Sequence, residues 1–207
     1  MSELYRQLCD KVDAFFARVS QRHPEHMSCD RGCYDCCDVR LTITGVEAAA
    51  VLAAWLALPQ ERRDEVRATW RPGASACAAL DRQGRCAVYD GRPLVCRSHG
   101  VPVRMTDRAA HPADGAAGGD EPGPHGHDGH DDASASASSL RRRSLPVVDV
   151  CFRNFTERGP EAADPDCVLD QTTLSAMLLL VDQQDAEACD RQAGLRFELA
   201  DLLTEDE

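Results

Sequence analysis

A cluster of closely spaced cysteines is the feature that most limits what this chain can fold into. The chain has eleven cysteines, and four of them fall in the nine residues CDRGCYDCC. An isolated free cysteine usually packs as a small apolar residue, but thiols this close in sequence need something to hold them together. The pattern therefore predicts a metal site, whose candidate ligands are Cys29, Cys33, Cys36, Cys37, Cys77, Cys86, Cys96 and Cys151.

The spacing within the first group indicates more than one metal ion. Cys33 and Cys36 form a CxxC pair, which supplies two ligands from one turn, and Cys29 adds a third donor from the same loop. Gly32 allows the backbone to turn there. The side chains of the neighbouring Cys36 and Cys37 diverge, so two adjacent ions or a bridging thiolate explain this doublet better than a single ion does.

The next three cysteines come from a separate stretch, ACAALDRQGRCAVYDGRPLVCRSHG, in which Gln83-Gly84 predicts a turn between the first two. Thiolates around a divalent ion carry excess negative charge, which arginines outside the ligand shell can offset. We expect Arg92 and Arg97, which flank Cys96, to act in this way, although a solvated surface arginine is an equally good interpretation of either.

Histidines offer further candidate donors. The tract HGHDGHDD contains His125, His127 and His130 and predicts a weak, exchangeable accessory metal site, with a polar spacer as the alternative. His99, three residues after Cys96, is a candidate to replace a thiolate, although an ordinary core or surface histidine is the commoner role. Cys9 and Cys189 lie away from the cluster, and we expect both to be ordinary half-buried residues.

Charge and hydropathy exclude several classes of function. The formal net charge is −12, with 35 acidic against 23 basic residues, which disfavours binding to nucleic acid or to an anionic membrane surface. The longest strongly apolar run, residues 174–181, is far shorter than the roughly 20 residues that span a bilayer. The first residues lack the apolar core of a secretory signal, so we expect a cytoplasmic protein whose partners are metal ions, with a protein partner unidentified.

Three other interpretations of the cysteines compete with metal binding. Structural disulfides are disfavoured in a reducing cytoplasm. A redox-active CxxC of the thioredoxin type requires a βαβ unit, which the chain does not show around Cys33 and Cys36. The spacing CxxxCxxC is also used by radical enzymes that hold an iron-sulfur cluster and adenosylmethionine, but those enzymes need a large β/α barrel. Zinc or iron bound by thiolates is therefore the favoured interpretation.

Hydrophobic periodicity predicts helices near both ends of the chain. Ser2 caps a helix that runs to about Gln21, with an apolar stripe formed by Leu4, Leu8, Val12, Phe15, Phe16 and Val19. Residues 39–43 alternate as a short strand, and the capping box from Thr44 to Glu47 begins a helix that Pro59 ends. A second helical piece covers residues 60–70. The last predicted element is a helix capped near Asp170, with an inward face formed by Leu174, Met177, Leu178 and Val181.

The segment 106–144 is rich in Ala, Gly, Asp, Ser and Pro, with almost no large apolar residue. It buries too little apolar surface to offset its ordering entropy, so we expect a disordered insertion. The remaining residues, 1–105 and 145–207, are predicted to form one small domain. Its expected fold class is mostly α with a few short strands (α+β), organised around the cysteine cluster with the N- and C-terminal helices packing on it.

The motifs resemble the YkgJ-type cysteine-cluster family, or CxxCxxCC family, which is described as a zinc- or iron-chelating domain. The resemblance is carried by CDRGCYDCCDVRLTITGVEAA, by CAALDRQGRCAVYDGRPLVCRSHGVPVR and by DVCFRNF, followed by QTTLSAMLLLVD at the position of the family's terminal helix. It covers about residues 25–105 and 145–185. The chain departs from the family pattern in its first spacing, which is CxxxC, and in the long insertion before Cys151.

The resemblance implies that the eight cysteines named above supply the metal ligands, with Arg92-Pro93 and Cys96-Arg97 as signature pairs. It implies zinc or iron as the cofactor, with more than one ion, and leaves the biochemical role open. Relatives of the domain include flagellin lysine methylases that carry an iron-sulfur cluster, so an iron-sulfur enzyme or electron carrier is the alternative function. The sequence offers no catalytic residue and no glycine motif for adenosylmethionine, which favours a non-enzymatic metal-binding protein.

Overall fold

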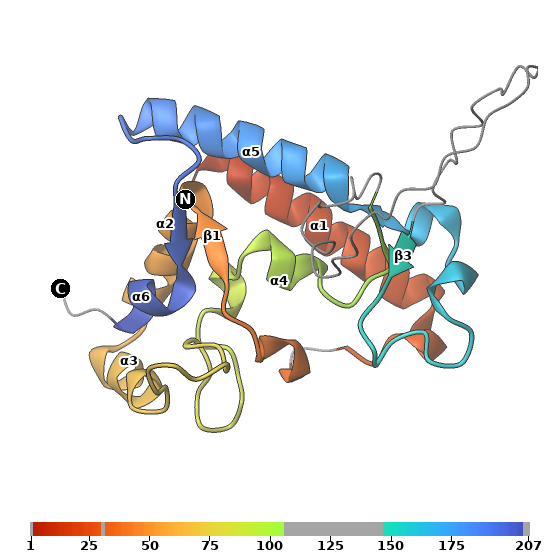
Figure 1. The fold of residues 1–207 in the computed structure, drawn as a ribbon, viewed down its shortest axis with the longest axis horizontal. Helices are drawn as coiled ribbons and strands as arrows, with labels where there is room; N and C mark the ends of the chain where they lie inside the picture. Colours follow the sequence, from red (N-terminus) through yellow and green to blue (C-terminus); the bar gives the residue numbers. More distant parts are fainter. Residues whose placement is uncertain (1, 30–31, 106–146, 205–207) are drawn as a thin grey trace, which may run out of the picture.

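Two long helices form the spine of the fold, α1 (Glu3–Arg22) and α5 (Gln171–Ala188). They lie side by side, and α5 runs back along α1 in the opposite direction (Figure 1). The computed structural model describes residues 2–29, 32–105 and 147–204. These residues form a small, mostly helical α+β domain, which confirms the predicted fold class.

The shorter elements occupy the space around and between these two helices. In chain order they are η1 (Pro24–His26), η2 (Asp35–Cys37), β1 (Thr42–Thr44), α2 (Gly45–Leu56), α3 (Gln60–Arg67), η3 (Tyr89–Gly91), α4 (Leu94–Ser98), β2 (Val103–Met105), β3 (Val147–Asp149), η4 (Pro160–Ala162), η5 (Pro165–Cys167), β4 (Leu169–Asp170), β5 (Arg196–Glu198) and α6 (Leu199–Thr204), with α5 between β4 and β5.

The predicted N-caps of the two long helices are present. The Ser2 hydroxyl accepts a hydrogen bond from the Tyr5 backbone N–H at 3.4 Å, and the Asp170 carboxylate accepts one from Thr173 N–H at 2.9 Å. Each cap satisfies a backbone donor that has no partner within its helix. The predicted stripe of α1 is correct at its centre but wrong at Leu4, which is 45% exposed because Tyr5 takes the inward position.

The capping box at the start of α2 is also confirmed. The carboxylate of Glu47 accepts hydrogen bonds from both the backbone N–H and the hydroxyl of Thr44, each at 3.0 Å. The other carboxylate oxygen accepts from the Leu94 N–H at 3.0 Å, at the start of α4. A single buried carboxylate therefore joins the N-termini of two helices, and this contact fixes where α4 lies.

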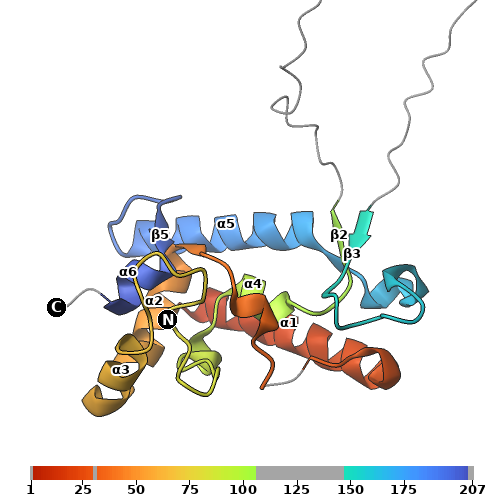
Figure 2. The same ribbon diagram turned by 60° about the horizontal axis from the view of Figure 1, so that its bottom comes forward.

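Short strands with distant partners hold the ends of the chain in place. β1 pairs antiparallel with β5 in the register Thr42↔Glu198, and β2 pairs antiparallel with β3 and parallel with β4. Figure 2 shows β2 and β3 side by side near the end of α5. Three of the expected elements need correction. The first strand starts at Thr42, and Val39, which was expected to belong to it, is exposed. The elements β5 and α6 follow α5, so α5 is not the last element. The helix predicted over 60–70 ends at Arg67.

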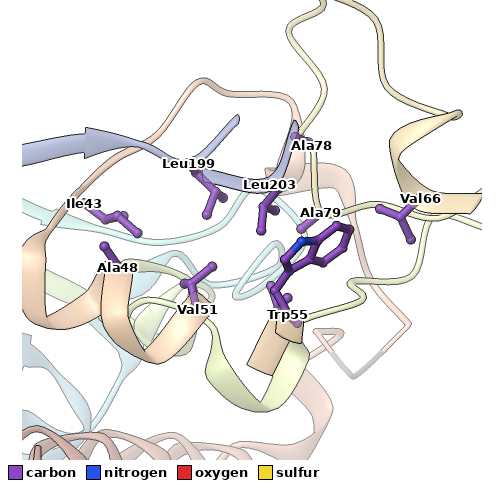
Figure 3. Close-up of a cluster of buried hydrophobic side chains, with 10 residues drawn as sticks. Ile43, Ala48, Val51, Trp55, Val66, Ala78, Ala79, Leu199 and Leu203 are labelled. Atoms are coloured by element: carbon purple, nitrogen blue, oxygen red, sulfur yellow. The ribbon is translucent and has the colours of Figure 1, made fainter. Parts of the chain in front are cut away.

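The largest apolar cluster lies between α2, α3 and α6 (Figure 3). Trp55 and Val51 of α2 pack against Leu199 and Leu203 of α6, and all four side chains are buried. Ala78 and Ala79, which directly follow Cys77, belong to the same cluster. The second group of cysteines is therefore anchored to the hydrophobic core.

Two predictions, the disordered insertion and the accessory metal site, concern residues outside the described part of the chain. The insertion 106–144 lies there, together with the accessory histidines His125, His127 and His130. Among the described residues, no helix combines the length and the apolar character needed to cross a lipid bilayer.

Candidate metal centre

Seven of the eight predicted cysteine ligands line one cavity of about 370 Å³. They are Cys29, Cys33, Cys36, Cys37, Cys77, Cys86 and Cys96, and His99 lines the same cavity. Apolar side chains from α1, α6 and the loops make up much of the wall, including Phe16, Val88 and Leu199. Cysteines as far apart in sequence as Cys29 and Cys96 thus present sulfur to a common, largely apolar space. We call this space the thiol cavity.

A backbone hydrogen bond joins the first two groups of cysteines. The turn η2 brings Cys36 and Cys37 together, with the Cys37 N–H donating to the Tyr34 carbonyl at 2.8 Å. The Cys37 carbonyl then accepts from the Cys77 N–H at 2.7 Å. In Figure 1, η2 (orange) lies beside the yellow-green loop that carries the second group, beneath α4. The two segments are therefore bonded to each other directly at the cavity wall.

The predicted turn at Gln83-Gly84 is confirmed. Leu80 and Cys86 form an antiparallel bridge, and Gly84 has φ +73°, a conformation that glycine adopts without steric cost. The buried carboxylate of Asp81 accepts from the backbone N–H groups of Gln83 and Arg85, at 2.9 and 2.8 Å. This tight hairpin brings Cys77 and Cys86 to the same wall of the cavity.

The helix α4 delivers Cys96 and ends next to His99. Glu47 fixes the start of α4 through Leu94, and Arg97 holds its other face by donating to Asp13 of α1 at 2.5 Å and to the Arg92 carbonyl at 3.0 Å. Arg97 is buried, so this contact is a structural anchor between α4 and α1. Cys96 and His99 are therefore positioned by the contact of α4 with the long N-terminal helix.

Cys151, the eighth predicted ligand, follows residues 106–146 in the sequence and lies at the edge of the thiol cavity. Its buried thiol hydrogen-bonds with the Cys29 thiol and with the His99 imidazole. Asn154 holds this arrangement: its side-chain oxygen accepts from the Ser28 N–H at 2.8 Å, and its amide nitrogen donates to the Gly100 carbonyl at 2.6 Å. One buried amide therefore ties together the segments that carry Cys29, His99 and Cys151.

The thiols of the second group are difficult to ionise in this setting. Burial, with the charge of the neighbouring Cys77, raises the pKa of Cys96 to about 12, and burial also raises the pKa of Cys86 to about 11. The pKa of Cys77 is raised as well, mainly by burial. Because a metal binds the thiolate, a cation in the cavity must displace protons from these sulfurs.

Cys36 and His99 form the opposite case. Hydrogen bonds from the Cys37 thiol and from His99 lower the pKa of Cys36 to about 4, and the same contact with Cys36 raises the pKa of His99 to about 9, despite its burial. The shared proton leaves the pKa of Cys37 above its ordinary value. Cys36 is therefore the thiol most ready to receive a cation, and His99 is a neighbouring donor whose proton the cation would replace.

The two signature arginines also line the cavity. Arg92 donates to the Tyr89 carbonyl at 2.9 Å and to Asp13 at 3.2 Å, and its guanidinium carbon lies 4.0 Å from the centre of the Tyr89 ring. Its positive charge favours the thiolate of Cys86, against the stronger effect of burial. The hydrogen bonds described for Arg92 and Arg97 go to oxygen atoms, so their expected contact with sulfur stays a prediction.

The donors surround the cavity more widely than a closed metal site requires. With metal-donor distances of about 2.0–2.3 Å, the donors of a tetrahedral zinc site lie about 3.3–3.8 Å apart. Among the described residues, three donor atoms lie mutually within 4.8 Å at His23, Asp164 and Cys167, and the cavity thiols form no such group. Thiol side chains must therefore rotate inward about their Cα–Cβ bonds for an ion to be held.

Two of the residues that organise this region were missed or undervalued by the sequence reasoning. Asn154 was not singled out. His99 was named as a candidate donor because it lies three residues after Cys96, but an ordinary core or surface role was preferred for it. Cys9 is buried on the inward face of α1, and Cys189 is exposed at the end of α5, so neither has the half-buried environment expected. Both do lie outside the thiol cavity, as predicted.

Comparison with protein-family models gives a match over part of the chain. Residues 28–111 match the CxxCxxCC family, described as "putative zinc- or iron-chelating domain", which confirms the resemblance for this segment. The matched segment carries seven of the candidate cysteines and His99, and Cys151 and Asn154 lie beyond it. Searches of curated proteins and of solved structures found no match.

Proposed function

On the premise that residues 28–111 carry a CxxCxxCC chelating domain, we propose that this protein binds two zinc or iron ions in the thiol cavity, with Cys151 and His99 completing the ligand set. The observation that carries the proposal is the convergence of eight thiols and one imidazole, from three separate segments of the chain, on one apolar cavity and its edge. Packing alone does not account for so many sulfur atoms facing one space.

The first proposed ion takes ligands from Cys37, Cys77, Cys86 and Cys96. Cys96 interacts electrostatically with both Cys77 and Cys86, and Cys37 interacts with Cys77 and Cys96. Four thiolates are the donor set of closed, structural zinc sites, and iron accepts the same set. These four residues come from the two segments that the Cys37–Cys77 backbone hydrogen bond joins, so the ion would hold those two segments together.

The second proposed ion takes ligands from Cys29, Cys33, Cys151 and His99. The Cys29 thiol interacts with those of Cys33 and Cys151, and His99 hydrogen-bonds with Cys151. Cys36 contacts both groups, through Cys37 on one side and His99 on the other, which suits a bridging thiolate. This division gives the Cys36-Cys37 doublet a reason, because its two side chains would serve different ions.

Cationic side chains near the two groups would offset the negative charge of bound thiolates. Arg92 lies close enough to favour the Cys86 thiolate, and the positive charge of Arg153 interacts electrostatically with Cys33 and Cys151. Both metals accept such donor sets, so the choice between zinc and iron depends on availability as well as geometry. The proposal assumes a reducing compartment, in which thiols persist.

The test is elemental analysis, with a visible absorption spectrum, of untagged protein prepared without oxygen. We expect about two ions per chain from the thiol cavity: a colourless protein if they are zinc, and a coloured one if they are iron. Cys86→Ser and Cys151→Ser should each lose about one of these ions. Cys189→Ser, which removes an exposed thiol outside the cavity, is the matched control and should lose none.

Two results would overturn the proposal. Freshly purified protein that contains neither zinc nor iron would exclude a resident metal centre. Unchanged metal content in both Cys86→Ser and Cys151→Ser would show that the thiols of the cavity are not the ligands, even in a protein that carries metal.

A further inference from the structure

A second group of metal-ligating side chains lies outside the thiol cavity, where α1 ends. His23, Asp164 and Cys167 each offer one donor atom, and these three atoms all lie within 4.8 Å of one another. None of the three residues lines the thiol cavity. Among the described residues they form a tighter set of donors than the cavity thiols do.

The local backbone holds the Asp164 and Cys167 side chains on the same side of one turn. Pro165 starts the 3-10 helix η5, and the Cys167 N–H donates to the Asp164 carbonyl at 2.8 Å. The sequence Asp-Pro-Asp-Cys therefore presents two ligands three residues apart, which is the spacing that a CxxC pair uses. Proline fixes the first φ of this turn and so limits the freedom that a bound ion would otherwise have to remove.

His23 is held in position before any ion arrives. It is the C-cap residue of α1, where its N–H donates to the Val19 carbonyl at 2.9 Å. Its buried ring lies 5.4 Å from the Phe155 ring and 6.4 Å from the His26 ring, centre to centre. Its Nε2 atom accepts from the Asp164 N–H at 3.4 Å and lies 3.7 Å from the Asp164 carboxylate, so this nitrogen faces the other donors.

We propose that His23, Asp164 and Cys167 form a separate binding site for one divalent transition-metal ion of the zinc type. A thiolate and a carboxylate balance the charge of a divalent ion, and the imidazole ligand is neutral, so the bound centre carries no net charge beside the core. Sulfur, nitrogen and oxygen donors together suit zinc and cobalt, and exclude a site for calcium or magnesium, which prefer oxygen alone.

The exposure of the three residues defines which side of this ion meets solvent. Cys167 is completely buried, next to Val19, Val101 and Phe155, whereas the Asp164 side chain is 52% exposed. With three protein ligands, the fourth position of a tetrahedral ion opens on the Asp164 side, where water can occupy it. The predicted site is therefore an open one, unlike the four-ligand groups proposed for the thiol cavity.

Arg22 competes with a bound ion for the Asp164 carboxylate. Its guanidinium lies 3.5 Å from the Asp164 carboxylate, but its closer partner is Asp166, at 2.7 Å. Arg22 therefore keeps an ion pair when Asp164 turns toward the metal. The His23 and Asp164 donors already lie 3.7 Å apart, and the three donors together need to approach by about 1 Å or less to reach tetrahedral distances.

A nucleophilic Cys-His-Asp triad is the other chemistry that these residue types permit, and the geometry disfavours it. A nucleophile must be reachable by its substrate, whereas Cys167 is completely buried. Burial and the charge of Asp166 also raise the pKa of its thiol, which is the opposite of what activates a cysteine. In addition, Asp164 faces the same imidazole nitrogen that a base would need for the thiol proton.

The test is the zinc content of the full-length chain, stripped of metal without oxygen and then dialysed to equilibrium against Zn²⁺. Asp164→Asn removes the charged ligand at an exposed position and is expected to lose about one equivalent of zinc. Asp166→Asn, in the same turn and with the same change of chemistry, keeps the wild-type content because Asp166 pairs with Arg22 and not with the ion. Cys167→Ser is expected to lose the same equivalent as Asp164→Asn.

The two variants together keep the result decisive, because Cys167→Ser changes a buried residue and Asp164→Asn does not. Wild-type zinc content in folded Asp164→Asn protein would overturn the site even if Cys167→Ser failed to fold. The outcome is independent of the thiol cavity: Cys86→Ser should lose a different equivalent and keep this one. A protein whose only zinc is lost through Cys86→Ser and Cys151→Ser retains its proposed function and lacks the site at Asp164.

Discussion

Two buried polar regions of this molecule satisfy their polar groups in opposite ways. In the first, which we call the carboxylate junction, Glu47 and Asp182 accept hydrogen bonds from the chain itself. Asp182 accepts from the Val46 N–H at 3.0 Å, the Gly194 N–H at 3.1 Å and Arg191 at 2.6 Å. In the thiol cavity the donors face one another instead, and burial raises the pKa of most of them.

The difference shows which part of the fold the polypeptide completes by itself. Each carboxylate of the junction has its lone pairs filled by N–H groups at helix starts and turns, so α2, α4 and α5 are joined without help. The cavity thiols become good ligands only as thiolates, and buried thiolates need a cation. We therefore expect the junction to be stable without metal and the cavity segments to depend on it.

The largest expected effect is that of metal removal. Stripping the protein with a chelator should loosen residues 77–96 and the turn η2, because their positions depend on shared ligands. Structural zinc contributes on the order of 10 kcal/mol to the folding of small zinc domains, so a large fall in melting temperature is expected. Hydrogen exchange should show the loss of protection in these segments, with protection retained in α2 and α5.

The opposite result would contradict the difference drawn between the carboxylate junction and the thiol cavity. Unchanged melting and unchanged hydrogen exchange after complete metal removal would mean that the cavity is as self-sufficient as the carboxylate junction. Uniform loss of protection throughout the chain would mean that the junction is not an independent unit.

The next largest effect is expected from Asp182→Ala. It leaves the N–H groups of Val46 and Gly194 without their partner and removes the closer of the two carboxylates that pair with Arg191. Removing one member of a buried charged network costs about 3–5 kcal/mol. Urea denaturation should measure this loss of stability, while the metal content of the folded protein stays at the wild-type value. Asp185→Ala removes a single contact of 3.1 Å with Arg191 and is the matched control, with a smaller loss expected. A fall in metal content in Asp182→Ala would show that the two regions are coupled.

The hairpin that carries Cys77 and Cys86 contains a buried carboxylate, Asp81. We expect its contribution to the stability of the fold to be lost in acid. Burial of Asp81 opposes ionisation, but hydrogen bonds from Arg85, Arg62 and Gln83 outweigh it and lower the pKa from 3.8 to about 2. Because the folded pKa is the lower one, the contribution is complete above about pH 5 and is lost as the pH falls toward 2. It amounts to about 2 kcal/mol.

Urea denaturation of the wild type and of Asp81→Asn, compared at each pH from 7 to 3, should show the gap in stability between them narrowing by about 1 kcal/mol, because about half of the contribution is lost by pH 3. Comparing the two proteins at equal pH cancels the displacement of metal by protons, which both share. If Asp81→Asn kept the full pH dependence of the wild type, the contribution would have to be assigned to other carboxylates.

The smallest effect is expected at a site remote from both regions. Ser2→Ala removes the N-cap of α1 and should lower the stability by about 1 kcal/mol or less, without a change in metal content. Ser2→Asp restores an acceptor at the same position and should recover the stability. A loss of metal in Ser2→Ala would show that α1 transmits strain to the cavity that it lines.

Local signals in the sequence predicted the four longer helices and the cysteine hairpin, since caps and turns depend on neighbouring residues. Ser2, Asp170 and the Thr44-Glu47 box identified three helix starts, and Gln83-Gly84 identified the turn. Of the short strands, only β1 was predicted, and its partner was not, because two- or three-residue segments have little periodicity. Thr42, for example, pairs with Glu198, and no local pattern reports such a distant partner.

The candidate site was predictable in its residue types and not in its organisation. The cysteine spacings identified eight candidate ligands, all of which the structure brings to the cavity or to its edge. Asn154 was not predictable, because its role comes from three loops that meet only in the folded chain. The same holds for the group at His23, where residues that are isolated in sequence converge through the packing of η5 on α1.

The pairing of β2 with β3 sets a rule for changing the length of this chain. Met105 lies opposite Val147, so the polypeptide leaves and rejoins the domain at adjacent points. His99 precedes this ladder and Cys151 follows it, and the ladder fixes their spacing whatever length of chain separates its two strands. Loop length has only a weak thermodynamic cost, so this position is a natural splice point. A short turn, a reporter or a whole foreign module could be grafted there with the candidate metal ligands left in register.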